Sequence, residues 1–131
     1  MAMRLKRGNR VPDVILVSPA ERTWSTAQII AEVCELADEQ IRCERELYLA
    51  TADGIWQVVS RQKPGIIHVL VCGHNPSLSA LASRFGPKQK KRELATAGIA
   101  TAVWPEGHWD NISPRSAVSC EMDDPDSADD D

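Results

Sequence analysis

Two short segments of the sequence place an arginine and a histidine where they could act on a phosphate group. Arg22 follows Ser-Pro-Ala-Glu at positions 18–21, and His74 follows a run of apolar residues and a glycine. A guanidinium group matches the oxygens of a phosphate and keeps its charge at any working pH. An imidazole can hydrogen-bond a phosphoryl oxygen or move a proton near neutral pH. This pair of residue types is therefore typical of phosphate binding or phosphoryl transfer.

The elements that precede these residues are expected to bring them together. The apolar runs Val14–Val17 and Ile66–Cys72 predict strands that are covered on both faces, as in a parallel sheet. Each run leads into a helix-start signal: a capping box with Ser18 as N-cap, and Asn75 as N-cap with a proline after it. Parallel strands end at one edge of a sheet, where ligands collect at helix N-termini. We therefore expect Arg22 and His74 to face one site.

The rest of the pattern predicts an α/β fold with a mostly parallel sheet. Helical spacing of apolar residues predicts helices over 18–37, from Thr51 to about Lys63, and over 75–85. Two late strands are predicted at 98–104 and 117–122, after a basic stretch at 88–92 that we interpret as a solvated loop. Residues 1–8 resemble the last two turns of a helix ending at a glycine.

Composition limits the chain to one domain of ordinary size. It has 131 residues, of which 43% are hydrophobic, and its formal net charge is −4. Residues 121–131 contain seven acids and no base, so we expect a domain over 1–120 and a disordered acidic tail over 121–131. No apolar run approaches the roughly 20 residues of a membrane-spanning helix, and no signal peptide is evident. We expect a cytoplasmic protein without a membrane partner.

Several other functions find no support in the sequence. The four cysteines, Cys34, Cys43, Cys72 and Cys120, form neither a C-x-x-C pair nor a cluster with histidines, so we expect reduced thiols and no metal site. Cys72 lacks the arginine six residues later that a cysteine phosphatase needs. No nucleotide-binding fingerprint occurs, and the basic stretch lacks interleaved aromatic residues. We therefore expect no cofactor and no nucleic acid partner.

The other two histidines are not expected to take part in chemistry. His68 is interpreted as a core histidine and His108 as an exposed turn residue.

The motifs resemble those of a known family. Residues 14–23, with Thr26-Ala27, are similar to the S-P-x-x-R-[AT] motif of the histidine phosphatase superfamily, and residues 69–76 are similar to its later G-H-N motif. Glu46-Leu47-Tyr48 and Thr96-Ala97-Gly98 resemble the small phosphohistidine phosphatase branch. The similarity extends over about residues 1 to 120, in the family's order and spacing.

This resemblance implies a three-layer sandwich around the central sheet and a set of site residues. Arg22 and Asn75 would bind phosphate, and His74 would stabilise the transferring phosphoryl group. Glu46 is a candidate proton donor, or alternatively a solvated carboxylate before a buried Leu-Tyr pair. The substrate would be a phosphohistidine protein or a phosphorylated small molecule.

The sequence departs from the family in one respect. Family members open with a strand that ends in Arg-His-Gly, whose histidine attacks phosphorus, and no Arg-His-Gly occurs in this sequence. We interpret the chain as truncated at the N-terminus, entering the family pattern partway through the first helix. In the family, the missing strand lies mid-sheet beside the strand that carries His74. Its absence would leave two sheet edges unpaired.

Three hypotheses follow from this departure. The first is a phosphatase of phosphomonoesters or phosphoramidates that is inactive or strongly impaired in this chain, because the nucleophile is missing. The second is a non-catalytic module that binds phosphate or a phosphoprotein. The third is a structural module, completed by a strand from a partner, for which a homo-oligomer is one form.

Overall fold

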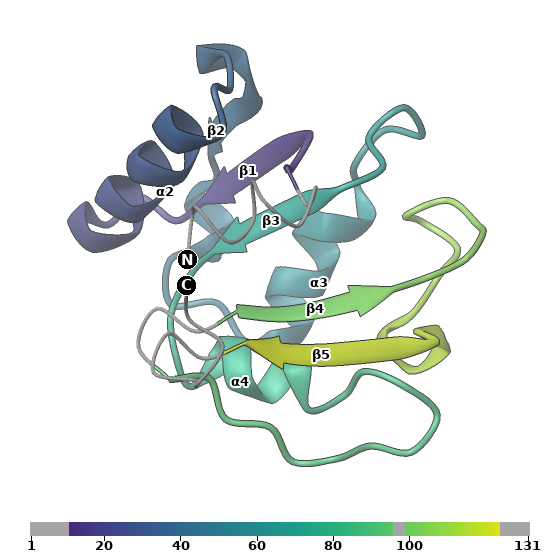
Figure 1. The fold of residues 1–131 in the computed structure, drawn as a ribbon. Helices are drawn as coiled ribbons and strands as arrows, with labels where there is room; N and C mark the ends of the chain where they lie inside the picture. The colour runs from purple at the N-terminus through teal and green to yellow at the C-terminus, as the bar shows by residue number, and fades with distance from the viewer. Residues whose placement is uncertain (1–10, 96–98, 124–131) are drawn as a thin grey trace.

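The computed structural model describes residues 11–95 and 99–123 as a parallel sheet flanked by helices, with a second, antiparallel sheet beside it (Figure 1). The elements in chain order are β1 (Val14–Val17), α2 (Glu21–Val33), η1 (Asp38–Gln40), β2 (Ile41–Cys43), η2 (Arg45–Leu47), α3 (Ala52–Ser60), β3 (Val69–Cys72), α4 (Ser77–Ala82), β4 (Ile99–Val103), η3 (Pro114–Ser116) and β5 (Ser119–Asp123). The segments η1, η2 and η3 are short 3₁₀ helices. None of the helices in these ranges is long and apolar enough to cross a membrane.

The parallel sheet has the strand order β2-β1-β3. β1 pairs with β3 from Val14 opposite Val69 to Val17 opposite Cys72, and with β2 over its last three residues. Every residue of β1 is at most 1% exposed, because the strand has a neighbour on each edge and helices over each face. This confirms the prediction of a buried parallel strand at Val14–Val17.

Helices cover both faces of this sheet and make three layers (Figure 1). Ile15 and Val17 point to one side, where they pack with buried apolar residues of α2. Val14 and Leu16 point to the other side, where they pack with α3 and α4. The predicted α/β fold with a mostly parallel central sheet is thus confirmed.

One strand of the parallel sheet was not expected from the sequence, and another begins later than expected. The strand β2 was not predicted, because its three residues are too few and too exposed to give an apolar run. β3 begins at Val69 and not at Ile66, because the backbone N–H groups of Ile67 and His68 both donate to the Asp13 carboxylate, at 2.8 and 2.9 Å. Asp13 thereby joins the starts of β1 and β3.

The second sheet pairs β4 with β5 in antiparallel register, from Ile99 opposite Asp123 to Val103 opposite Ser119. Figure 1 shows β4 lying between β3 and β5. Residues of β3 and β4 pack against the same core clusters, yet among the described residues β3 pairs only with β1, and β4 only with β5. Each strand therefore has an edge without a described partner. β3 is correspondingly half-buried over Val69–Val71, although its sequence is as apolar as that of β1.

The C-terminal strand changes the expected start of the acidic tail. β5 extends to Asp123, so Glu121 and Asp123 belong to a strand and not to the predicted tail. Residues 124–131 lie outside the described residues, as do the predicted helix end at 1–8 and Thr96-Ala97-Gly98. The described part of the late strand predicted at 98–104 corresponds to β4.

Candidate functional site

A hydrogen bond between Ser18 and His74 joins the turns that follow β1 and β3. The Ser18 Oγ and His74 Nε2 atoms are 2.8 Å apart, although 56 residues separate them in the sequence. The parallel pairing of the two strands makes this contact, since the Ser18 N–H also donates to the Cys72 carbonyl at 3.0 Å. The expectation that the two turns share one edge of the sheet is correct.

The prediction that Ser18 caps the first helix is wrong. α2 begins at Glu21 after Ala20, and no side chain caps it. The Ser18 hydroxyl is buried and bonded to His74, so it is not available to the helix. Thr23 instead folds back on the turn, and its hydroxyl donates to the carbonyls of Ser18 and Ala20, at 2.7 and 2.9 Å. These two hydrogen bonds stabilise the turn in the absence of a conventional cap.

Arg22 occupies the second position of α2, at the same edge as His74. Its side chain is exposed, and within residues 11–95 and 99–123 its guanidinium has no hydrogen-bond or ion-pair partner. The first backbone N–H groups of a helix lack intrahelical acceptors, and they attract anions. The N-terminus of α2 and the Arg22 charge are therefore both available to an anion. The assignment of Arg22 to phosphate stays a prediction.

The predicted N-cap of the helix after β3 is shifted by one residue, because α4 starts at Ser77 with Pro76, and not Asn75, at the N-cap position. The Asn75 side chain nevertheless bonds the first turn of the helix. Its Oδ1 accepts hydrogen bonds from the Ser79 backbone N–H at 3.1 Å and from the Ser79 hydroxyl at 2.8 Å. Its Nδ2 donates to the Leu94 carbonyl at 3.1 Å. Both ends of the carboxamide hold the backbone around His74 in place, and direct binding of phosphate by Asn75 stays a prediction.

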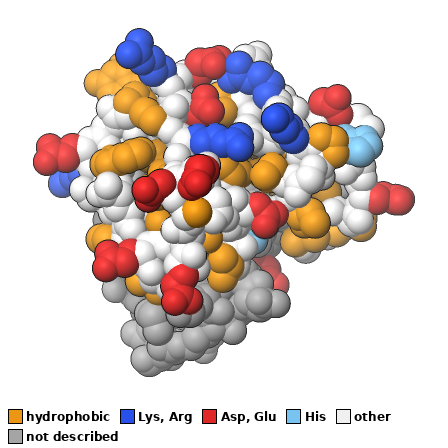
Figure 2. Space-filling view, turned by 90° about the horizontal axis from the view of Figure 1, so that it is seen from above, with side chains coloured by type: hydrophobic (Ala, Val, Ile, Leu, Met, Phe, Trp, Pro, Cys, Tyr) orange, Lys and Arg blue, Asp and Glu red, His pale blue; other side chains and the backbone are white. Residues whose placement is uncertain are grey.

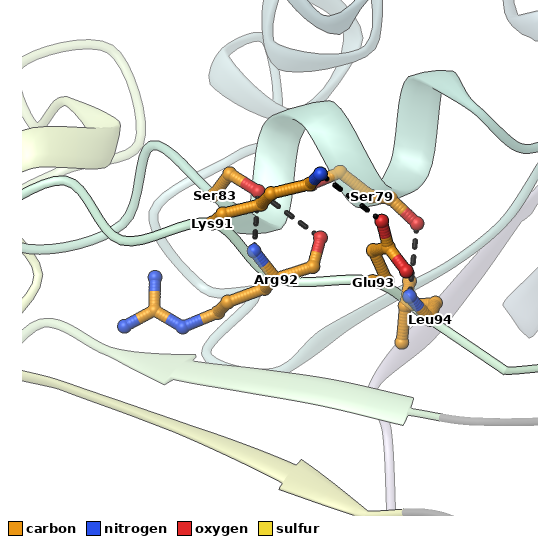
Figure 3. Close-up of polar contacts among 6 residues, drawn as sticks. All are labelled: Ser79, Ser83, Lys91, Arg92, Glu93 and Leu94. Carbon is orange, nitrogen blue, oxygen red and sulfur yellow. Dashed lines mark hydrogen bonds and ion pairs between the residues drawn. The ribbon is translucent and has the colours of Figure 1, made fainter.

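The segment that contains Leu94 is held along α4 by two serines (Figure 3). The Leu94 N–H donates to the Ser79 Oγ at 2.9 Å, and the Arg92 N–H donates to the Ser83 Oγ at 2.7 Å. The Arg92 guanidinium donates to the Ala82 and Phe85 carbonyls at the end of α4. The interpretation of 88–92 as a purely solvated loop is therefore wrong at Arg92, which stabilises a helix C-terminus.

Tyr48 lies against His74, a contact that the sequence analysis missed. The two ring centroids are 6.0 Å apart and the ring planes are perpendicular. The segment reaches the site because Glu44, directly after β2, donates its N–H to the Val17 carbonyl at 2.8 Å. Recognition of β2 as a strand parallel to β1 would have placed Tyr48 at this edge.

Glu46 points to α3. Its carboxylate accepts a hydrogen bond from Arg61 at 2.7 Å, and both side chains are exposed. Among the described residues it has no contact with His74. The role of Glu46 as a proton donor stays a prediction. The interaction that the structure shows is its surface ion pair with Arg61.

The thiols do not offer an alternative nucleophile at this edge. Burial raises the pKa of the Cys72 thiol to about 12, so it remains protonated at neutral pH. Cys34 is buried as well, whereas Cys43 is exposed, and no disulfide joins any two of the described cysteines. No group of three or more potential metal ligands occurs in the described ranges.

Charges of both signs are distributed over the surface. Figure 2 shows acidic and basic side chains interspersed with hydrophobic ones over one face of the molecule.

Comparison of the structure with solved structures shows where this fold occurs. A protein of Nakamurella multipartitia assigned as the phosphohistidine phosphatase SixA aligns over 96% of this chain and 78% of its own, with a TM-score of 0.72 and 22% identity. The protein histidine phosphatase SixA in complex with tungstate aligns over 79% of this chain and 67% of its own, with a TM-score of 0.69 and 22% identity.

The chain has the SixA fold. No protein-family model matches the sequence, and no curated protein sequence does. The resemblance to the histidine phosphatase superfamily that the sequence motifs indicated is therefore confirmed as a resemblance of fold. In this SixA fold, the Ser18 and His74 turns lie at the carboxyl edge of the parallel strands, where open α/β sheets bind their ligands.

Proposed function

We propose that the carboxyl edge of β1 and β3 is a phosphoryl-binding site of the phosphohistidine phosphatase type. The single observation that supports this most directly is the 2.8 Å contact of Ser18 with His74, because it fixes an imidazole beside the N-terminus of α2. The ligand would be a phosphohistidine protein or a phosphorylated small molecule. One structural neighbour was solved with tungstate, a tetrahedral oxyanion.

Each residue of the proposed site has a distinct task. Ser18 occupies the Nε2 atom of His74, which leaves Nδ1 for a phosphoryl oxygen. Arg22 supplies the fixed positive charge, and the free N–H groups at the start of α2 supply further donors. Tyr48 packs against the imidazole and restricts its rotation.

We infer that these 131 residues bind a phosphoryl group but hydrolyse it slowly or not at all. The sequence contains no Arg-His-Gly, and the buried Cys72 thiol is protonated. A cytoplasmic location is also inferred, since disulfides are rare in that compartment and none joins the described cysteines.

Titration of the purified chain with inorganic phosphate and with tungstate, followed by NMR, tests the binding site. We expect shifts at residues 18–23 and 73–77. Arg22→Ala should weaken binding by about tenfold or more, because hydrogen bonds to charged groups contribute roughly 1.5–3 kcal/mol. Arg115→Ala, in the exposed η3, is the matched control for loss of one positive charge. The absence of shifts at both turns would refute the proposal.

Hydrolysis of p-nitrophenyl phosphate by the same sample tests the inferred lack of turnover. We expect a rate equal to that of buffer. Turnover that disappears in His74→Ala would show that the chain is a working phosphatase after all.

The edges of β3 and β4 that have no strand partner among the described residues favour a second candidate function, a module that accepts a strand from a partner. The two edges carry apolar residues that face the same two cores, among them Val69 and Ala100 on one side and Leu70 and Ile99 on the other. An inserted strand with apolar residues on both faces would bury the exposed parts of these side chains.

Light scattering and amide hydrogen exchange test the second candidate. A strand contributed by a second copy predicts a dimer, with β3 amides as protected as those of β1. A monomer in which β3 exchanges much faster than β1 would exclude self-complementation.

A further inference from the structure

We propose that Tyr48 and Leu49 form a recognition surface, the Tyr48–Leu49 lip, for the group that carries the phosphoryl. The lip would favour a flat or apolar carrier, such as an aryl or imidazole ring, over a small polar one. This inference rests on the proposed phosphoryl site around His74 and adds to it the residues that select the ligand.

The first argument is position. The Tyr48 ring stands perpendicular to the His74 ring at a centroid distance of 6.0 Å. A phosphoryl group bound by His74 would therefore hold its carrier group within reach of Tyr48. Perpendicular and offset arrangements are those that aromatic rings prefer, so a carrier ring would gain a favourable contact there.

The second argument is exposure. Tyr48 is 54% exposed and Leu49 is 78% exposed, although both are large and apolar and lie next to each other. Their neighbour Leu47 is only 2% exposed and belongs to the core. The chain thus buries one of three consecutive apolar side chains and exposes the other two, of which Tyr48 packs against His74.

The third argument is backbone conformation. Leu49 has a φ of 55°, in the left-handed region that a side chain of this kind rarely adopts. Anchors on both sides impose it: Leu47 is buried, and the Ala50 carbonyl accepts a hydrogen bond from the hydroxyl of Ser77, at the start of α4. Strain of this kind clusters at ligand-binding sites, where the surroundings over-determine the conformation.

The fourth argument is charge. Glu46 precedes the lip by two residues, and a free carboxylate there would repel a phosphorylated ligand. Its charge is paired with Arg61 instead, at 2.7 Å. The lip itself therefore presents an aromatic ring and an aliphatic side chain.

The test compares three ligands that the chain cannot hydrolyse: inorganic phosphate, methylphosphonate and phenylphosphonate, each titrated by NMR or calorimetry. We expect phenylphosphonate to bind about threefold to tenfold more tightly than methylphosphonate, the range of an aromatic contact. Tyr48→Ala should reduce this ratio towards one, and Tyr48→Phe should retain it. Leu49→Asn should reduce the ratio in part while preserving the fold, since asparagine tolerates the left-handed conformation.

The control is Ile67→Ala, which removes an 83% exposed apolar side chain just before β3, at the opposite end of the sheet from His74. It should leave the ratio unchanged.

If inorganic phosphate itself fails to bind the unmodified chain, the proposed function is wrong. If phosphate binds but phenylphosphonate and methylphosphonate bind equally well, or if Tyr48→Ala weakens all three ligands by the same factor, only the lip is refuted. Should Tyr48→Ala fail to fold, Leu49→Asn decides the outcome by the same ratio.

Discussion

The Ser18 hydroxyl and the His74 Nε2 atom lie 2.8 Å apart, and they connect two strand-to-helix turns that are 56 residues apart in the chain. A short polar side chain at the end of a buried strand thereby sets the orientation of the imidazole. The helix α2 begins after Ala20, two residues beyond Ser18, and no side chain caps it. The Ser18 hydroxyl therefore serves the orientation of His74 and not the start of the helix.

Ser18→Ala should weaken phosphate binding several-fold and lower the free energy of unfolding by about 1 kcal/mol, the net worth of a typical hydrogen bond. The His74 ring would lose its fixed orientation. Urea denaturation and a phosphate titration measure the two effects. Ser25→Ala, on the exposed face of α2, is the matched control. Unaltered phosphate affinity in Ser18→Ala would mean that the contact does not position His74.

The raised pKa of Cys72 predicts a loss of stability in alkali. The unfolded thiol ionises near 9.0 and the folded one near 12, so the unfolded state loses its proton first. The stabilisation of the folded state by the protonated Cys72 thiol is complete below pH 9. As the pH rises from 9 towards 12, the free energy of unfolding falls by about 1.4 kcal/mol per pH unit. Urea denaturation between pH 8 and 10.5 should show a shallower decline for Cys72→Ala than for the unmodified chain. Equal slopes would contradict a buried neutral thiol.

Ile15→Ala should lower the free energy of unfolding by about 2–5 kcal/mol, because Ile15 is fully buried in the central strand and its truncation leaves a cavity. Ile29→Ala removes the same side chain from a 59% exposed position on α2 and should cost less than about 1 kcal/mol. Thermal or urea denaturation of both variants gives the comparison. Similar losses in the two would show that β1 is not the centre of the core.

Ser83→Ala should release the segment 91–94 from α4. The Ser83 hydroxyl is hydrogen-bonded to both the N–H and the carbonyl of Arg92 (Figure 3). We expect faster trypsin cleavage after Lys90, Lys91 and Arg92, followed by mass spectrometry. Ser60→Ala is the control, because the Ser60 hydroxyl bonds only within α3, to Gln57, among the described residues. Identical cleavage rates would show that the serine does not hold this segment.

Sequence alone was sufficient for the elements with strong apolar patterns. β1 coincides with its predicted bounds, and α3 begins at Ala52, one residue after the predicted start at Thr51, because both signals are local. It was insufficient wherever a side chain finds a partner far along the chain. The local pattern predicts a helix cap at Ser18, whose actual partner, His74, lies in another motif. It predicts a solvated residue at Arg92, whose guanidinium in fact donates to carbonyls at a helix end 7 to 10 residues earlier.

The candidate site was predicted in outline and incompletely. Arg22 and His74 were placed at one edge from the strand-to-helix turns, a rule of parallel sheets that needs no contact information. Tyr48 was missed because β2 is a strand by virtue of its pairing with β1, and three residues carry no periodicity of their own. Glu46 was considered for the site from the resemblance alone, and the structure pairs it with Arg61.

All contacts that shape the His74 edge among the described residues come from the β2-β1-β3 sheet, its helices and the segment up to Leu94. β4 and β5 pair with each other and take no part in these contacts. Substitutions in β4 and β5 should therefore act on stability, through residues such as Ala100, Ala102 and Cys120 that pack against the core, and not on the geometry around His74.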